Sequence, residues 1–194
     1  MRTIAVTLLL AAAMLGGRPA HAQEAVALEP MRVRIETSLG PFVMELDAAR
    51  APLTVASFLR YLERGFYEDT VMHRVVPGFV VQGGGYGPDG TPRAVAAPVP
   101  NESGNGLSNL RGTVAMARTG DPHSATSQFY VNLADNPALD PQPSRWGYAV
   151  FGRVVEGMEV LERIGTVTTR VHPQLGPDFP EQPVRILRAE RLRP

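Results

Sequence analysis

The sequence of 194 residues contains no cysteine and only four histidines, His21, His73, His123 and His172. The absence of cysteine excludes disulfides, thiolate catalysis and cysteine-based zinc sites. No two of the histidines have a spacing typical of a shared metal site. We therefore expect neither a metal nor any other cofactor.

The chain also has no excess of charge of either sign. Lys and Arg together number 19, as do Asp and Glu, so the formal net charge is zero. This balance lacks the basic footprint that proteins use to bind nucleic acid or an anionic membrane surface. No long apolar run follows the N-terminus, so we expect no nucleic-acid partner and no membrane insertion.

Residues 1–22 have the pattern of a secretory signal peptide. Arg2 supplies the positive start, and the apolar run from Ile4 to Leu15 is too short to span a bilayer. Ala20-His21-Ala22 is a small-x-small cleavage site. We predict export to the periplasm with cleavage after Ala22, a short tail over 23–30, and one folded domain over 31–194, long enough for a proper core.

The hydrophobic pattern indicates a mainly β fold. Alternation over 32–37, a turn at 38–41 and a return over 42–46 predict a hairpin. Apolar residues at helical spacing predict helices over 51–61, ended by Gly65, and over 156–164. Further strands are expected over 71–76, 80–82, 113–117, 129–133, 149–154 and 184–192.

Eight short strands and two helices favour a closed eight-stranded antiparallel β-barrel capped by the two helices, and a β-sandwich remains an alternative. The segment 83–112 is rich in Gly, Pro, Asn and Ser. It is too long for a plain connection, which favours a functional surface loop.

Two β-rich stretches carry the residues of a candidate binding pocket. The first holds Arg74 and Gln82, separated by a Pro-Gly turn and Phe79, and the second holds Gln128 and Tyr130. Each of these residues alone is more typical of a solvated strand face or of the core. Together they provide a fixed cation, two amides and an aromatic floor without a nucleophile, which suits binding and polarising a neutral amide.

Four motifs carry a resemblance to the cyclophilins, the cyclosporin-binding peptidyl-prolyl cis-trans isomerases, and particularly to their bacterial periplasmic members. They occur in the family's order and with compatible spacing over the whole mature chain: His73 to Phe79 with Gln82-Gly83-Gly84, Ala115 to Arg118, Ser127 to Tyr130, and Gly147 to Gly152. The resemblance implies a monomeric isomerase that acts on proline-containing polypeptides and needs no cofactor.

The resemblance also implies roles for individual residues. As catalytic residues it indicates Arg74, Phe79, Gln82, Gln128 and Tyr130. As further substrate contacts it indicates His73, Val80, Ala117, Arg118, Leu139 and Tyr148. The chain departs from the family at three positions, where Tyr130 replaces the usual phenylalanine, and Ala138 and Tyr148 replace a tryptophan and a histidine of eukaryotic members.

The same residues are compatible with other functions to different degrees. A non-catalytic peptide-binding module or holdase could use the same groove. A hydrolase would need His73 or His123 beside Ser103, Ser124 or Ser127, none of which lies in a G-x-S-x-G elbow. A phosphate-binding loop at 83–87 lacks the lysine and the following helix.

Overall fold

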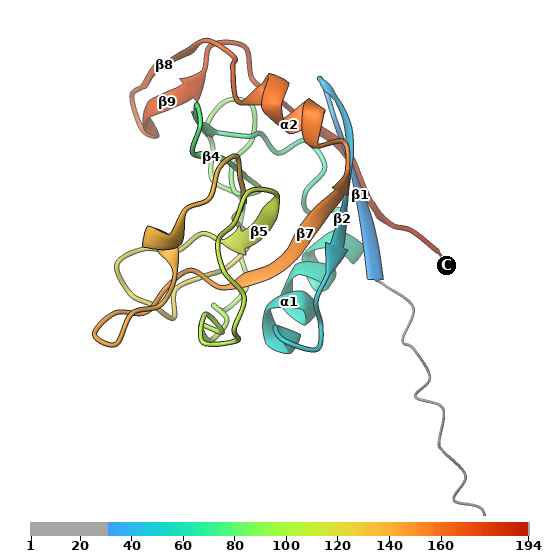
Figure 1. Cartoon of the computed structure of the whole chain (residues 1–194). Coiled ribbons are helices and arrows are strands. Elements are labelled where there is room, and N and C mark those ends of the chain that lie inside the picture. The colour runs from blue at the N-terminus through green and yellow to red at the C-terminus, as the bar shows by residue number, and fades with distance from the viewer. Residues whose placement is uncertain (1–30, 194) are drawn as a thin grey trace, which may run out of the picture.

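The computed structural model describes residues 31–193 (Figure 1). The predicted signal peptide and the tail over 23–30 lie outside the described residues. Eight strands form one antiparallel sheet: β1 (Met31–Thr37), β2 (Gly40–Leu46), β3 (Arg74–Val76), β4 (Val80–Gly83), β5 (Thr113–Met116), β6 (Phe129–Asn132), β7 (Val150–Glu156) and β10 (Ile186–Arg191). The remaining elements are α1 (Pro52–Glu63), a 3₁₀ turn (Pro137–Leu139), α2 (Met158–Ile164), β8 (Thr169–His172) and β9 (Gly176–Pro180).

The sheet curls into a barrel that is only partly closed. Its strand order is β10-β1-β2-β7-β5-β6-β4-β3, so β3 and β10 are its two edges. The segment before β3 joins these edges, because Met72 N donates to Val184 O at 2.9 Å and Ile186 N donates to Thr70 O at 2.8 Å. The predicted mainly β fold with eight antiparallel strands and two helices is confirmed, and the closure is looser than expected.

The predicted elements differ from the observed ones mainly at their ends. The expected strand over 71–76 begins only at Arg74, because Val71 makes a single isolated bridge to Arg185 instead of a ladder. The β8–β9 hairpin was not predicted at all. It forms a separate two-stranded sheet.

The core fills the inside of the barrel and the space under α1. The rings of Phe58, Tyr67, Phe129 and Phe151 are fully buried, and Phe58 contacts each of the other three with centroid separations of 5.0, 5.7 and 5.3 Å respectively. Edge-to-face and offset contacts at these distances are favourable for aromatic rings. Phe58 therefore ties α1 to β6 and β7.

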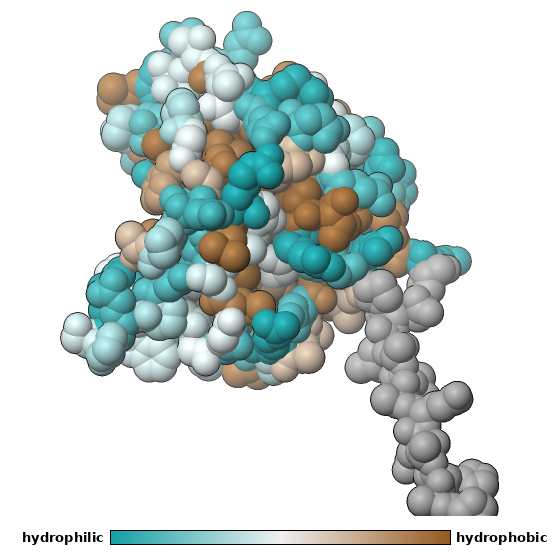
Figure 2. Space-filling view, viewed as in Figure 1, coloured by the Kyte–Doolittle hydropathy of each residue, from teal (hydrophilic) through white to brown (hydrophobic). Residues whose placement is uncertain are grey.

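The outer surface is mixed in character. On the face in Figure 2, hydrophobic residues form separate patches interrupted by hydrophilic ones. Within residues 31–193, no helix has the length and apolar character needed to cross a membrane.

Candidate functional site

A row of side chains crosses four neighbouring strands on the outer face of the sheet. Arg74 on β3 pairs with Gln82 on β4, which pairs with Tyr130 on β6, which pairs with Ala115 on β5. Because successive side chains of a strand point to opposite faces, directly paired residues share one face. Their neighbours along the strands belong to the barrel core: Val75, Val81 and Val131.

This row lies beneath a pocket of about 330 Å³. The pocket is lined by Arg74, Phe79, Val80, Gln82, Ala117, Arg118, Tyr130, Leu139 and Tyr148. Its volume is near the lower end of the range for ligand pockets, about 300–1,000 Å³. Its apolar part is a small cluster separate from the barrel core, built on buried Val80, Tyr130 and Val150 with Phe79 and Leu139 packed against them.

The structure brings together nine of the eleven residues that the sequence indicated, and all nine line this pocket. The other two, His73 and Gln128, are absent from the lining and lie behind Gln82. Gln82 Nε2 donates to Gln128 Oε1 at 3.0 Å and lies 3.4 Å from His73 Nε2. Both residues therefore hold the Gln82 amide in place at the edge of the pocket.

Two features maintain this amide arrangement. A Cβ atom on Gly85 would lie 2.5 Å from Gln128 Cγ, so only glycine leaves room for the Gln128 side chain. His73 is 6% exposed, and burial lowers its pKa to about 4. His73 is therefore neutral at physiological pH and adds no charge beside Gln82.

The hydroxyl of Tyr130 is accommodated beneath the pocket. It donates to Asn109 Oδ1 at 2.7 Å, and Asn109 Nδ2 donates in turn to Asp140 Oδ1 at 2.8 Å. Burial opposes the charge on Asp140, but hydrogen bonds from Ser108 and Asn109 outweigh it and lower the pKa of that carboxyl. Burial raises the pKa of Tyr130, so its hydroxyl stays protonated and remains a donor.

Arg118 forms one wall of the pocket and is fixed by backbone carbonyls. Its guanidinium donates to Trp146 O and Thr119 O, both at 2.9 Å, and to Gly147 O at 3.3 Å. Its Cζ lies 4.4 Å from the centroid of the Tyr148 ring. These contacts use three of the five Arg118 N–H donors. Arg118 therefore supports the shape of the wall, and Arg74, which makes no such bonds to backbone carbonyls within residues 31–193, is the freer cation.

Arg74 stands at the rim of the pocket with 38% of its side chain exposed. Its Nε lies 3.6 Å from Asp178 Oδ2 on β9, and its Cζ lies 6.0 Å from the centroid of the Phe79 ring. Asp178, Asn109 and Asp140 were not indicated by the sequence. The only signal for Asn109 is its place in the polar loop over 83–112, and Asp140 and Asp178 carry none.

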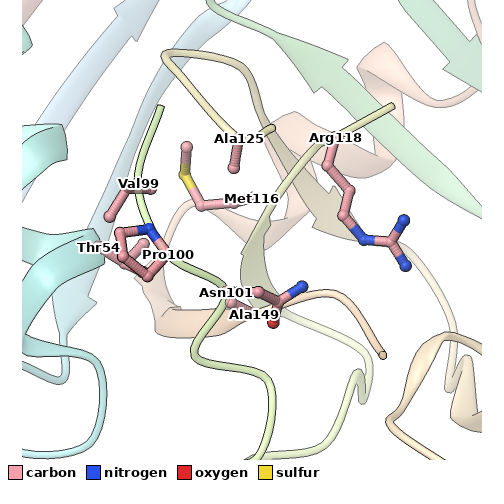
Figure 3. A pocket seen from close by; sticks show the side chains of 8 residues that line it. All are labelled: Thr54, Val99, Pro100, Asn101, Met116, Arg118, Ala125 and Ala149. Carbon is pink, nitrogen blue, oxygen red and sulfur yellow. The ribbon is translucent and has the colours of Figure 1, made fainter. Parts of the chain in front are cut away.

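A second cavity lies close by and is far smaller. Figure 3 shows its lining side chains, with the Arg118 guanidinium pointing away from the others. The cavity measures about 10 Å³, barely the space that one water needs. It lies between Thr54, Val99 and Met116 and is far too small for a peptide segment.

The competing chemistries find no support in residues 31–193. His73 Nε2 faces Gln82 and His123 Nδ1 accepts from Asn101 N at 3.1 Å, so neither histidine activates a serine. The described part of the chain has no cluster of His, Asp or Glu that could hold a metal. The glycines over 83–87 are followed by loop and then β5, not by a helix.

Comparisons with known proteins agree with this geometry. The family profile described as cyclophilin type peptidyl-prolyl cis-trans isomerase/CLD matches residues 32–191. Peptidyl-prolyl cis-trans isomerase A of Dickeya dadantii is 47% identical over 163 residues, which are 83% of this chain and 84% of that protein. Peptidyl-prolyl cis-trans isomerase B of Escherichia coli is 46% identical over 140 residues, 71% of this chain and 85% of that protein.

Solved structures show the same fold. The crystal structure of a cyclophilin type peptidyl-prolyl cis-trans isomerase of Cryptosporidium parvum, in the presence of the dipeptide Ala-Pro, superimposes with a TM-score of 0.72 at 25% identity. The match covers 84% of this chain and 99% of that chain.

Proposed function

The chain belongs to the cyclophilin family of peptidyl-prolyl cis-trans isomerases, and from this premise we propose that it accelerates X-Pro bond rotation in exported proteins with Arg74 as the donor to the prolyl nitrogen. The observation that carries the proposal is the position of Arg74, a permanently charged donor at the rim of a pocket whose apolar part is the cluster around Val80 and Tyr130. The substrate is a polypeptide segment that contains proline.

The mechanism follows from the physics of the amide bond. Rotation about an X-Pro bond breaks amide resonance over a barrier of about 18–20 kcal/mol. In the twisted state the prolyl nitrogen regains its lone pair and becomes a hydrogen-bond acceptor, whereas in the planar states it is not one. A donor aimed at this nitrogen therefore stabilises the transition state more than either ground state, which is what lowers a barrier.

The surrounding residues divide the remaining work. Phe79, Val80, Tyr130 and Leu139 provide the apolar walls for the proline ring, and excluding water strengthens the interaction with Arg74. The Gln82 amide, held by Gln128 and His73, is placed to bind the substrate backbone. Because no covalent bond breaks, the reaction requires no nucleophile, general base or cofactor.

The setting of this activity is proposed from the N-terminal sequence. The pattern of residues 1–22 favours export, cleavage after Ala22 and a periplasmic location. A monomer suffices for this activity, because a single chain supplies a complete pocket lining. Mass spectrometry of the periplasmic protein should give a chain that starts at Gln23, and a chain starting at Met1 in the cytoplasm would contradict export.

The isomerase activity is tested with a short X-Pro peptide whose cis-to-trans conversion is followed with and without the purified mature protein. We expect conversion that normally takes tens to hundreds of seconds to be accelerated in proportion to enzyme concentration. A protein that binds the peptide without accelerating conversion would instead be the holdase or peptide-binding module.

A further inference from the structure

The β8–β9 hairpin places a carboxylate beside the pocket arginine. In Figure 1 the hairpin stands outside the eight-stranded sheet, and β9 packs against β3, the strand that carries Arg74. Asp178 Oδ2 lies 3.6 Å from Arg74 Nε. None of the residues that line the pocket is acidic, so the carboxylate of this ion pair comes from outside the lining.

The backbone at Asp178 is held in an unusual conformation. Its φ of 71° lies in the left-handed region, where the described residues have only one other non-glycine residue, Asp69. Aspartate and asparagine are among the L residues that tolerate this region best. The next residue, Phe179, is 1% exposed and packs on the His172 ring with a centroid separation of 4.7 Å. His172 belongs to β8, so this contact stiffens the hairpin itself, and the packing of β9 on β3 sets where Asp178 lies.

The contact engages only one end of the Arg74 guanidinium. The ion pair is formed through Nε, and Phe79 lies near the guanidinium, 6.0 Å from Cζ to ring centroid. Within residues 31–193, the two terminal nitrogens of Arg74 form no other ion pair or side-chain hydrogen bond. At 3.6 Å from Asp178 Oδ2, the Nε atom takes part in an ion pair without a hydrogen bond, and the terminal nitrogens stay available to the substrate.

We propose that Asp178 is a positioning residue that keeps the Arg74 guanidinium oriented toward the proline pocket. This inference rests on the proposed function, because it takes Arg74 as the donor to the prolyl nitrogen. An arginine side chain has many rotamers, and ordering it only when the imide twists would add an entropic cost to the barrier. Asp178 orders it beforehand. Since both side chains are about one third exposed, the pair contributes little to folding stability, and its effect falls on catalysis.

The test compares Asp178→Asn and Asp178→Gly with the wild-type mature protein. Asn removes the charge and Gly removes the side chain, and both suit a positive φ, whereas Ala would add backbone strain. We expect kcat to fall about two- to fivefold in both variants, the factor that corresponds to an exposed ion pair. KM should change little, because an interaction that matters in the transition state lowers kcat and kcat/KM together.

A double-mutant cycle makes the role specific. In an Arg74→Ala background, Asp178→Asn should have no further effect, since its partner is already gone. The difference between wild type and Asp178→Asn should also shrink at about 1 M salt, where screening acts over roughly 3 Å. The matched control is Glu190→Gln, which removes a carboxylate from the partly exposed pair with Arg188 away from the pocket lining and should retain wild-type activity.

Two results would overturn the inference. One is an Asp178→Asn variant with kcat equal to or above that of the wild type, and the other is an equal loss in the presence and absence of Arg74. An inactive wild-type protein would instead contradict the proposed function, so failure of the positioning role and failure of the isomerase activity are distinguishable.

Discussion

Substituting Tyr130 with Phe tests whether the extra hydroxyl belongs to the support of the pocket or to its interior. The hydroxyl donates to Asn109 Oδ1 at 2.7 Å, and this oxygen also accepts from Asn132 Nδ2 at 3.3 Å. In Tyr130→Phe the acceptor therefore keeps one partner, and the loss is that of a single net hydrogen bond. We expect the free energy of unfolding to fall by about 0.5–1.5 kcal/mol.

The expected loss corresponds to a drop in melting temperature of about 2–4 °C per kcal/mol for a domain of this size, measurable by calorimetry or circular dichroism. The value of kcat/KM should change by no more than about twofold, because the ring keeps its place in the pocket wall. A loss of 1.4 kcal/mol of transition-state binding would instead lower it about tenfold. The matched control is Tyr148→Phe, since no hydrogen bond by the Tyr148 hydroxyl occurs within residues 31–193, and it should alter stability by less than about 0.5 kcal/mol.

The reasoning would be refuted by the opposite pattern in Tyr130→Phe. A tenfold or larger change in kcat/KM at unchanged stability, on the scale of 1.4 kcal/mol, would show that the hydroxyl faces the substrate. Tyr130→Ala provides the upper reference, because losing the whole ring should cost about 3–5 kcal/mol and open the wall of the pocket.

Three further predictions concern pH and inhibition. Burial lowers the pKa of His73 in the folded protein to about 4, from an ordinary value of 6.5. The stability that depends on neutral His73 is therefore present above pH 6.5 and lost as the pH falls toward 4. The free energy of unfolding at pH 7 and at pH 5 should differ by about 2 kcal/mol because of this group, and a His73→Gln variant with an unchanged pH profile would contradict the prediction. Since an arginine guanidinium stays charged at every relevant pH, the isomerisation rate should be nearly flat from about pH 6 to 9. Ala138, which is exposed beside the pocket residue Leu139, stands where eukaryotic cyclophilins carry a tryptophan. We therefore expect weak inhibition by cyclosporin, and at least about thirtyfold tighter inhibition of Ala138→Trp. Tight nanomolar inhibition of the unmodified protein would contradict this, and since Trp146 packs edge-on against His123 at 5.2 Å, Trp146→Ala would then show whether that ring had moved in to replace the missing one.

The parts of the molecule that sequence could predict are those with local patterns or tightly spaced motifs. Alternation over β1 and β2 identified the first hairpin, and helical spacing identified α1. The resemblance indicated every residue that lines the pocket. Three of them, Arg74, Gln82 and Tyr130, share one face because they are directly paired on neighbouring strands.

The parts that escaped prediction depend on contacts between distant segments. The β8–β9 hairpin has exposed residues on both faces and a shifted register, so its sequence carries little alternation, and its packing on β3 is a tertiary effect. The Asn109–Asp140 bond joins two loops, and the Asp178–Arg74 pair joins the hairpin to the sheet. The two residues of each pair are far apart in the sequence, and no motif fixes the number of residues between them.

The central claim is that Arg74 donates to the twisted imide, and the most direct measurement is kcat/KM for an X-Pro peptide with Arg74→Ala and Arg74→Lys. Removing a transition-state donor costs roughly 10²–10³-fold in comparable sites, and because the side chain is partly exposed its removal should leave the fold intact. Lysine retains the charge without the planar fork, so it should recover only part of the loss. We predict a folded Arg74→Ala protein with kcat/KM reduced by roughly one to three orders of magnitude, and a folded variant with near-wild-type activity would contradict the donor role of Arg74.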